Sequence, residues 1–146
     1  MNRSLLGCVG AVLVMLASGT NAIAAEEVSL FSGDGTAAAY VDVDDELTIY
    51  LWDGKPVAHL QPNGDVYGFN GKHLGWFENG VVWNHNGNVS CAAKQRLKTA
   101  QFEPFKSFKR FRPFKAFKEF APARPAFSGS FGDLPCDLLL GAGAAD

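Results

Sequence analysis

Short apolar runs alternate with breaks rich in Gly, Asn and Asp between residues 28 and 93. An Asp or Asn followed by Gly at the centre of a break, with apolar runs on both sides, predicts a β-hairpin with a type I′ turn, in which both central residues have positive φ. Such pairs occur at Asp34-Gly35, Asp53-Gly54, Asn70-Gly71 and Asn86-Gly87, spaced 19, 17 and 16 residues apart. The predicted strands cover 28–31, 37–41, 47–52, 57–60, 66–69, 74–77, 81–83 and 89–92.

A second set of turn signals, at 44–45, 62–65 and 79–80, joins these hairpins into an eight-strand antiparallel meander. One short hairpin is only marginally stable in water, so the four hairpins are expected to share a core around a common axis. The predicted fold class is therefore all-β, with no helical period before residue 93. The expected core residues are Leu30, Tyr40, Leu47, Ile49, Leu51, Val57, Leu60, Val66, Phe69, Leu74, Trp76, Val81 and Trp83.

The units IYLWDGKPVAHL, VYGFNGKHLGWFENG and VVWNHNGN, followed by a tail rich in Phe, Lys and Pro, resemble the bacterial 4-fold β-flower domain family. The resemblance implies a small radially repeated β-domain with four hairpin petals, exported or envelope-associated in many members. It supplies no catalytic residues. The first unit departs from the pattern, because Gly33-Asp34-Gly35 lacks an aromatic residue before the turn.

From residue 102 onward, Phe recurs at every third position. A polyproline II helix has three residues per turn and would place these rings on one edge, whereas an α-helix would wind them around its axis and a strand would alternate them between faces. Short 3₁₀ turns share the period but seldom exceed three or four residues. The tail is therefore predicted to be extended. The row comprises Phe102, Phe105, Phe108, Phe111, Phe114, Phe117 and Phe120.

Charge separates the chain into two opposite blocks. Residues 26–93 contain ten Asp plus Glu against two Lys, a net charge of −8, and residues 94–124 contain ten Lys plus Arg against two Glu, a net charge of +8. We expect the tail to pack on its own β-domain, with Phe side chains filling grooves between petals and cations meeting the acidic face. The cations proposed for this docking, or for a surface role, are Lys106, Lys109, Arg112, Lys115 and Lys118.

The same combination of Phe and Lys suits an anionic lipid, lipopolysaccharide or another envelope component, which is the alternative role of the tail. A docked tail could also be exchanged between chains, so the oligomeric state is left open. Nucleic acid is not expected as a partner, because an exported protein rarely meets it.

The N-terminus has the parts of a secretory signal peptide over residues 1–24: Arg3, an apolar stretch over 5–17 and a cleavage site at Ala22-Ile23-Ala24. A membrane anchor is an alternative, although about 20 residues are needed to span a bilayer. A lipoprotein signal at 5–8 is another. We predict a periplasmic or secreted protein with no transmembrane span in the mature chain, a β-domain over 25–93, a basic aromatic tail over 94–132 and a C-terminal segment over 133–146.

Signal removal leaves two cysteines, Cys91 and Cys136, which in an oxidising compartment are expected to form a disulfide. Free or intermolecular thiols are the alternative, because sequence gives no distance between the two residues. The sequence also leaves open whether the apolar run 138–140 forms a strand or frays.

No motif in the sequence predicts an enzyme, a cofactor or a metal site. His59, His73 and His85 stand at different offsets from their turn glycines, so solvated or hairpin-face histidines are expected rather than a symmetric zinc site. The acidic stretch 42–46 lacks the glycine and distal Glu of a calcium loop, which favours an acidic turn. We therefore predict a non-enzymatic binding or structural module at the cell envelope, with a small-molecule-binding or hydrolytic enzyme as an alternative.

Overall fold

The computed structural model describes residues 26–145, so the predicted signal segment and its cleavage site lie outside the described residues. Eight antiparallel strands form a closed barrel in which each strand pairs with its neighbours in sequence and β1 pairs with β8. The predicted all-β meander is confirmed. The strands are β1 (Glu27–Phe31), β2 (Ala37–Asp42), β3 (Thr48–Leu51), β4 (Pro56–Leu60), β5 (Asp65–Gly68), β6 (His73–Glu78), β7 (Val81–Trp83) and β8 (Val89–Ala93).

Hairpins β1–β2, β3–β4, β5–β6 and β7–β8 are the four petals, and their tips are the predicted Asx-Gly turns. The expected type I′ geometry is wrong, because only the glycine of each pair has positive φ, from +79 to +88. In the first petal, the Asp34 carboxylate accepts the N–H of Thr36 at 2.9 Å, and the same bond recurs from Lys55 to Asp53. This side-chain bond holds the Asx residue at negative φ, and a β-bulge in each petal accommodates the longer loop.

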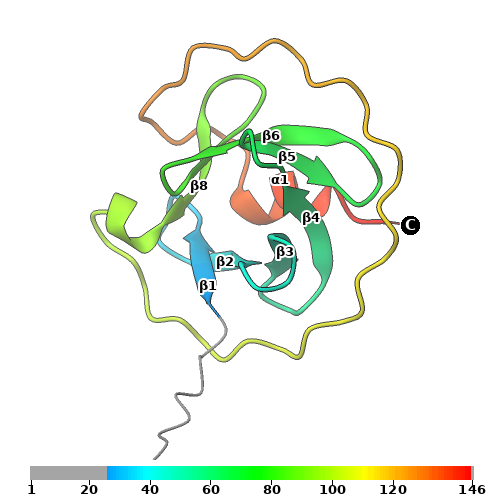
Figure 1. Cartoon of the computed structure of the whole chain (residues 1–146). Coiled ribbons are helices and arrows are strands. Elements are labelled where there is room, and N and C mark those ends of the chain that lie inside the picture. The colour runs from blue at the N-terminus through cyan, green and yellow to red at the C-terminus, as the bar shows by residue number, and fades with distance from the viewer. Residues whose placement is uncertain (1–25, 146) are drawn as a thin grey trace, which may run out of the picture.

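The inside of the barrel is filled by aliphatic side chains of alternating strand positions. Ala39, Val41 and Ile49 belong to this cluster. A short helix, α1 (Cys136–Gly141), adds Cys136, Leu139 and Leu140 to it, and Figure 1 shows that helix within the ring of strands. The apolar run 138–140 is therefore helical rather than a strand or a frayed end. Burying these three side chains lets the C-terminal segment close the core that the short strands leave open.

Most of the predicted core residues are buried, but they divide between two faces of the strands. Tyr40, Phe69 and Trp76 are almost completely buried, yet they lie outside the interior cluster. Because side chains alternate along a strand, Tyr40 points away from the barrel between the inward Ala39 and Val41. In the last petal the prediction chose the wrong alternate residues. Val82 is buried inside the barrel, whereas the predicted core residues Val81 and Trp83 are half-buried. The remaining candidates Leu47 and Leu51 are half-buried against the core.

The tail encircles this barrel. Figure 1 shows the chain after β8, coloured from yellow-green to orange, running around the outside of the strands as an almost complete ring. Apart from a single 3₁₀ turn, η1 (Lys94–Arg96), the segment up to residue 130 has no helix or strand. Within residues 26–145, no helix has the length and apolar character needed to cross a bilayer.

Candidate functional site

The tail is bound to one petal after another by a nine-residue repeat. The backbone N–H of Gln101 donates to the carbonyl of Gly35, that of Arg110 to Gly54, that of Glu119 to Gly71 and that of Ser128 to Gly87, at 2.8–3.0 Å. Nine residues at three per turn make three turns, or about 28 Å of extended chain per petal. The internal repeat of the tail therefore has the same period as the petals it crosses.

The turn glycines also allow the tail to approach closely. A Cβ atom on Gly54 would lie 2.0 Å from the carbonyl oxygen of Phe108, and one on Gly71 would lie 2.1 Å from that of Phe117. These glycines thus meet two requirements, since the turn needs positive φ and the tail backbone leaves no room for a side chain.

Gly54→Ala is expected to destabilise the protein by about 2 kcal/mol more than Gly80→Ala. Both glycines have positive φ, but the nearest atom to a Cβ on Gly80 is 3.1 Å away and belongs to β8, not to the tail. The excess reflects the bonds from Arg110 to Gly54 and from Ser107 to Trp52, each worth about 1 kcal/mol. Urea denaturation of both variants measures it. Equal destabilisation would show that the tail contributes nothing at this petal.

A second edge of the tail carries cations that face the acidic side of the barrel. Lys106 Nζ lies 2.5 Å from Glu27 Oε2, and Lys109 Nζ bridges Glu27 at 2.7 Å and Asp42 at 2.5 Å. Further along, Arg112 contacts Asp45 at 3.2 Å and Glu46 at 2.9 Å, Lys115 contacts Glu46 at 3.3 Å, and Arg124 contacts Glu78 at 3.3 Å. The predicted docking of the basic tail on the acidic domain is confirmed. The acidic stretch 42–46 serves as its main receptor.

Beneath these cations lies a layer of aromatic side chains on the outer face of the strands. Lys106 Nζ stands 4.6 Å from the ring centre of Tyr40, and Lys118 Nζ stands 5.6 Å from that of Tyr67. In the last petal Phe127 occupies the position that Lys109 and Lys118 hold in the preceding repeats, and it stacks on Trp83 with ring centres 4.3 Å apart. Electron-rich ring faces attract cations, so the outer layer selects the cationic edge of the tail.

The ion pairs shift the titration of their members. Burial by itself would raise the pKa of Glu27, but hydrogen bonds from Lys106 and Lys109 hold it below its usual range. Burial likewise opposes the charge of Lys109, yet its bonds to Asp42 and Glu27 raise the pKa of the ammonium group. The exposed Glu46 has a lowered pKa because Arg112 and Lys115 donate to it. The ionised forms of both partners are therefore favoured in the folded chain.

The third edge of the tail is the phenylalanine row, and it points away from the protein. All seven predicted rings, Phe102 to Phe120, have 92–103% of their surface exposed. The expectation that these rings fill grooves between petals is wrong. An extended chain with three residues per turn has three edges. The cations and the residues whose backbone N–H groups bond to the petals occupy two of these edges, so the Phe edge points outward. The row spans the two tail repeats between the first petal and the third.

The histidines were expected on solvated or hairpin faces, but His59 and His73 are buried, and His73 is in contact with His85. His73 Nδ1 lies 2.9 Å from His85 Nε2, and His73 Nε2 lies 3.1 Å from Asp65 Oδ1. Trp76 of β6 pairs with Trp83 of β7, and this register brings His73 near His85, so the strand pairing could have predicted the contact. His59 is buried separately under the tail. Among residues 26–145, no cluster of His, Cys, Asp and Glu is arranged to hold a metal.

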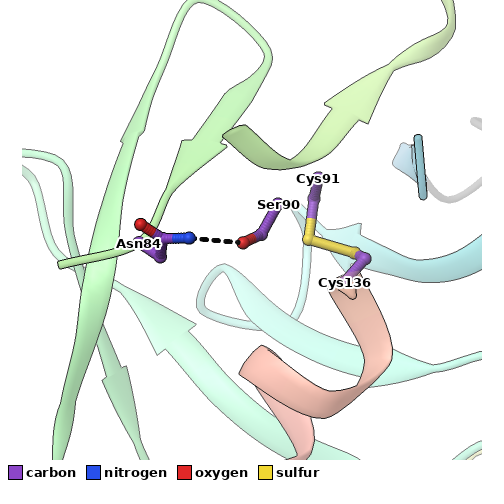
Figure 2. The surroundings of a disulfide bond; sticks show 4 residues. All are labelled: Asn84, Ser90, Cys91 and Cys136. Atoms are coloured by element: carbon purple, nitrogen blue, oxygen red, sulfur yellow. Dashed lines mark hydrogen bonds between the residues drawn. A yellow bond between two sulfur atoms is a disulfide. The ribbon is translucent and has the colours of Figure 1, made fainter. Parts of the chain in front are cut away.

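Cys91 and Cys136 form the predicted disulfide, with Cα atoms 4.9 Å apart (Figure 2). The bridge joins β8 to the first residue of α1 and encloses the entire tail between its two ends. The tail is therefore fixed at both ends as well as along its length.

These features define a class of small closed barrels in which four radially arranged hairpins are bound by an extended segment of the same chain. The chain belongs to the 4-fold beta flower protein family, whose model matches residues 28–140 and so includes the tail and most of α1. No curated protein and no solved structure matches the chain.

Proposed function

We propose that the mature chain is a non-enzymatic binding module, periplasmic or secreted, that attaches to lipid surfaces of the cell envelope through the phenylalanine row. The observation that carries the proposal is the full exposure of seven rings on a segment that hydrogen bonds and ion pairs hold in place. Export is supported by the signal-like N-terminus and by the Cys91–Cys136 disulfide, a bond that persists in oxidising compartments.

The size of the row favours a binding role over an incidental surface feature. An aromatic side chain contributes about 150–250 Å² on burial, so seven rings offer roughly 1,000–1,700 Å². The largest apolar patch on a typical monomer is about 300–600 Å². Successive rings are about 9 Å apart in a three-residue period, so they form one continuous line.

The inward direction of the cations favours the apolar part of a membrane over its charged headgroups. Lys106, Lys109 and Arg112 are engaged with carboxylates of the barrel, which leaves phenyl rings as the outward groups of the same segment. Binding by such a row depends mainly on buried apolar area. We therefore expect it to resist salt, unlike binding through basic residues.

The test is co-sedimentation of the mature chain with phosphatidylcholine vesicles, with and without phosphatidylglycerol. We expect binding to both, retained from about 0.1 to about 1 M salt, over which the Debye length falls from about 10 to about 3 Å. A Phe108→Ser/Phe111→Ser/Phe114→Ser variant should bind at least ten-fold more weakly. These rings make no packing contacts that folding requires, since each is 98–100% exposed.

Leu138→Ser is the matched control, because Leu138 is also exposed, at 61%, but lies on α1 outside the row. It should bind like the parent chain. Failure to bind either vesicle would refute the lipid proposal. Binding that needs phosphatidylglycerol and disappears in salt would assign the interaction to cations instead.

A further inference from the structure

A cavity of about 640 Å³ lies where the first two petals meet the C-terminal segment. Its apolar part includes Leu51 of β3, the Trp52 ring, and Phe131 and Leu134 of the C-terminal segment. The volume falls within the range of small-molecule sites, about 300–1,000 Å³. The phenylalanine row takes no part in it, so the cavity is a separate feature of the molecule.

The ionisable side chains lining the cavity are all acidic. Asp34 and Asp53 come from the first two petal turns, and Asp133 and Asp137 come from the C-terminal segment. Within residues 26–145, the cation that forms an ion pair with one of them is Arg110, 3.8 Å from Asp53, and both of those side chains are largely exposed. Several other acidic residues of the barrel pair with tail cations, as Asp42 does with Lys109. The lining of the cavity carries a net negative charge.

The disulfide holds two walls of the cavity together. Ser90 precedes Cys91, Asp137 follows Cys136, and both line the cavity. Figure 2 shows Ser90 beside the disulfide, accepting the amide of Asn84 at 3.3 Å. Ser90 is 1% exposed. The Ser90 hydroxyl is thus directed at Asn84, which does not line the cavity, so Ser90 contributes a wall that the neighbouring disulfide holds in place.

We propose that this cavity binds an organic cation, an ammonium or guanidinium group carried on an apolar body. The carboxylates attract the cationic group, and the aliphatic and aromatic walls accept the apolar body. Trp52 contributes an apolar wall, since its ring already has the tail cation Lys106 5.0 Å from its centre. An anionic ligand would meet four carboxylates, and a neutral one would leave them without a counter-charge.

Isothermal titration of the mature chain with 2-phenylethylammonium tests the proposal, with 2-phenylethanol and phenylacetate as neutral and anionic analogues of similar shape. We expect the cation to bind at least ten-fold more tightly than the alcohol, and phenylacetate not to bind. The Asp133→Asn/Asp137→Asn variant should weaken binding of the cation at least five-fold. Both side chains are in exposed residues, so the fold should be retained.

Glu26→Gln is the matched control, since Glu26 is exposed and does not line the cavity. It removes one negative charge and should leave affinity unchanged. The single variant Asp133→Asn, outside α1, repeats the test if the double variant melts early. Equal affinity for the ammonium and the alcohol, no heat with the ammonium, or full affinity in the Asp variants would each overturn the proposal.

Discussion

Replacing Cys91 and Cys136 together by Ala is expected to lower the free energy of unfolding by about 4 kcal/mol. The two cysteines are 45 residues apart, and closing a loop of that size removes this much chain entropy from the unfolded state. Both side chains are completely buried, so the substitution also removes packing from the barrel core. The loss is large for a chain this short, because small domains have little stability to spare.

Guanidinium denaturation followed by tryptophan fluorescence measures the change, and the reduced parent chain is the control. Reduction opens the loop but keeps both sulfur atoms in place, so the difference between the two samples isolates the packing contribution. We expect most of the loss to appear on reduction alone. A loss below about 1 kcal/mol in the reduced parent would contradict the role assigned to the loop.

Local chemistry explains why the petals could be predicted from the sequence. Each petal is short and its turn is marked by a glycine that must adopt positive φ, as Gly54 and Gly71 do. The alternation of side chains then sets strand positions to within about two residues. The turn type was not predictable from the residue pair alone, because the Asp34 and Asp53 carboxylates stabilise a different loop from the type I′ turn that Asx-Gly usually favours.

The orientation of the tail could not be predicted for a different reason. Opposite charges indicated that the tail packs on the barrel, and the period of three indicated that it is extended, but neither decided which edge of the tail faces the barrel. The outcome depends on the outer face, where Tyr40 and Tyr67 present rings beside carboxylates. Recognising this layer requires knowing which residues of every strand point into the barrel and which point outward. Tyr40 instead looked like an ordinary core residue from its sequence context.

His59 is the group under the tail whose protonation should matter most for stability. It is 1% exposed, and burial followed by the nearby Lys115 and Lys118 lowers its pKa to about 4. A hydrogen-bond chain fixes its neutral form: Lys118 donates to Gln61 Oε1 at 2.7 Å, and the Gln61 amide lies 2.9 Å from His59 Nδ1. Since an amide nitrogen only donates, Nδ1 must accept. Protonation at Nδ1 would break this bond and place a third cation beside the two lysines.

Lowering the pH from about 6.5 to about 4 is therefore expected to reduce the stability of the folded chain by up to about 3 kcal/mol through His59. In this window the unfolded chain binds a proton at His59 and the folded chain does not. The contribution is complete above the ordinary pKa of about 6.5 and is lost as the pH falls toward the folded value. Glu27 and Glu46 have lowered pKa values, so their ion pairs with the tail persist through most of the same window.

Urea denaturation at about pH 7 and about pH 4.5 measures this dependence in the parent chain and in His59→Phe, which cannot titrate. The quantity to compare is the change between the two pH values, because the substitution also alters packing against Tyr67 and Phe69. His85→Gln is the control: partial desolvation and then His73 also lower the pKa of His85, but this side chain is largely exposed and lies outside the hydrogen-bond chain from Lys118 through Gln61. The control should keep most of the pH dependence, and His59→Phe should lose most of it. If His59→Phe keeps the parent's dependence, the loss of stability in acid arises from other groups, and the hydrogen-bond chain from Lys118 through Gln61 to His59 does not couple the tail to pH.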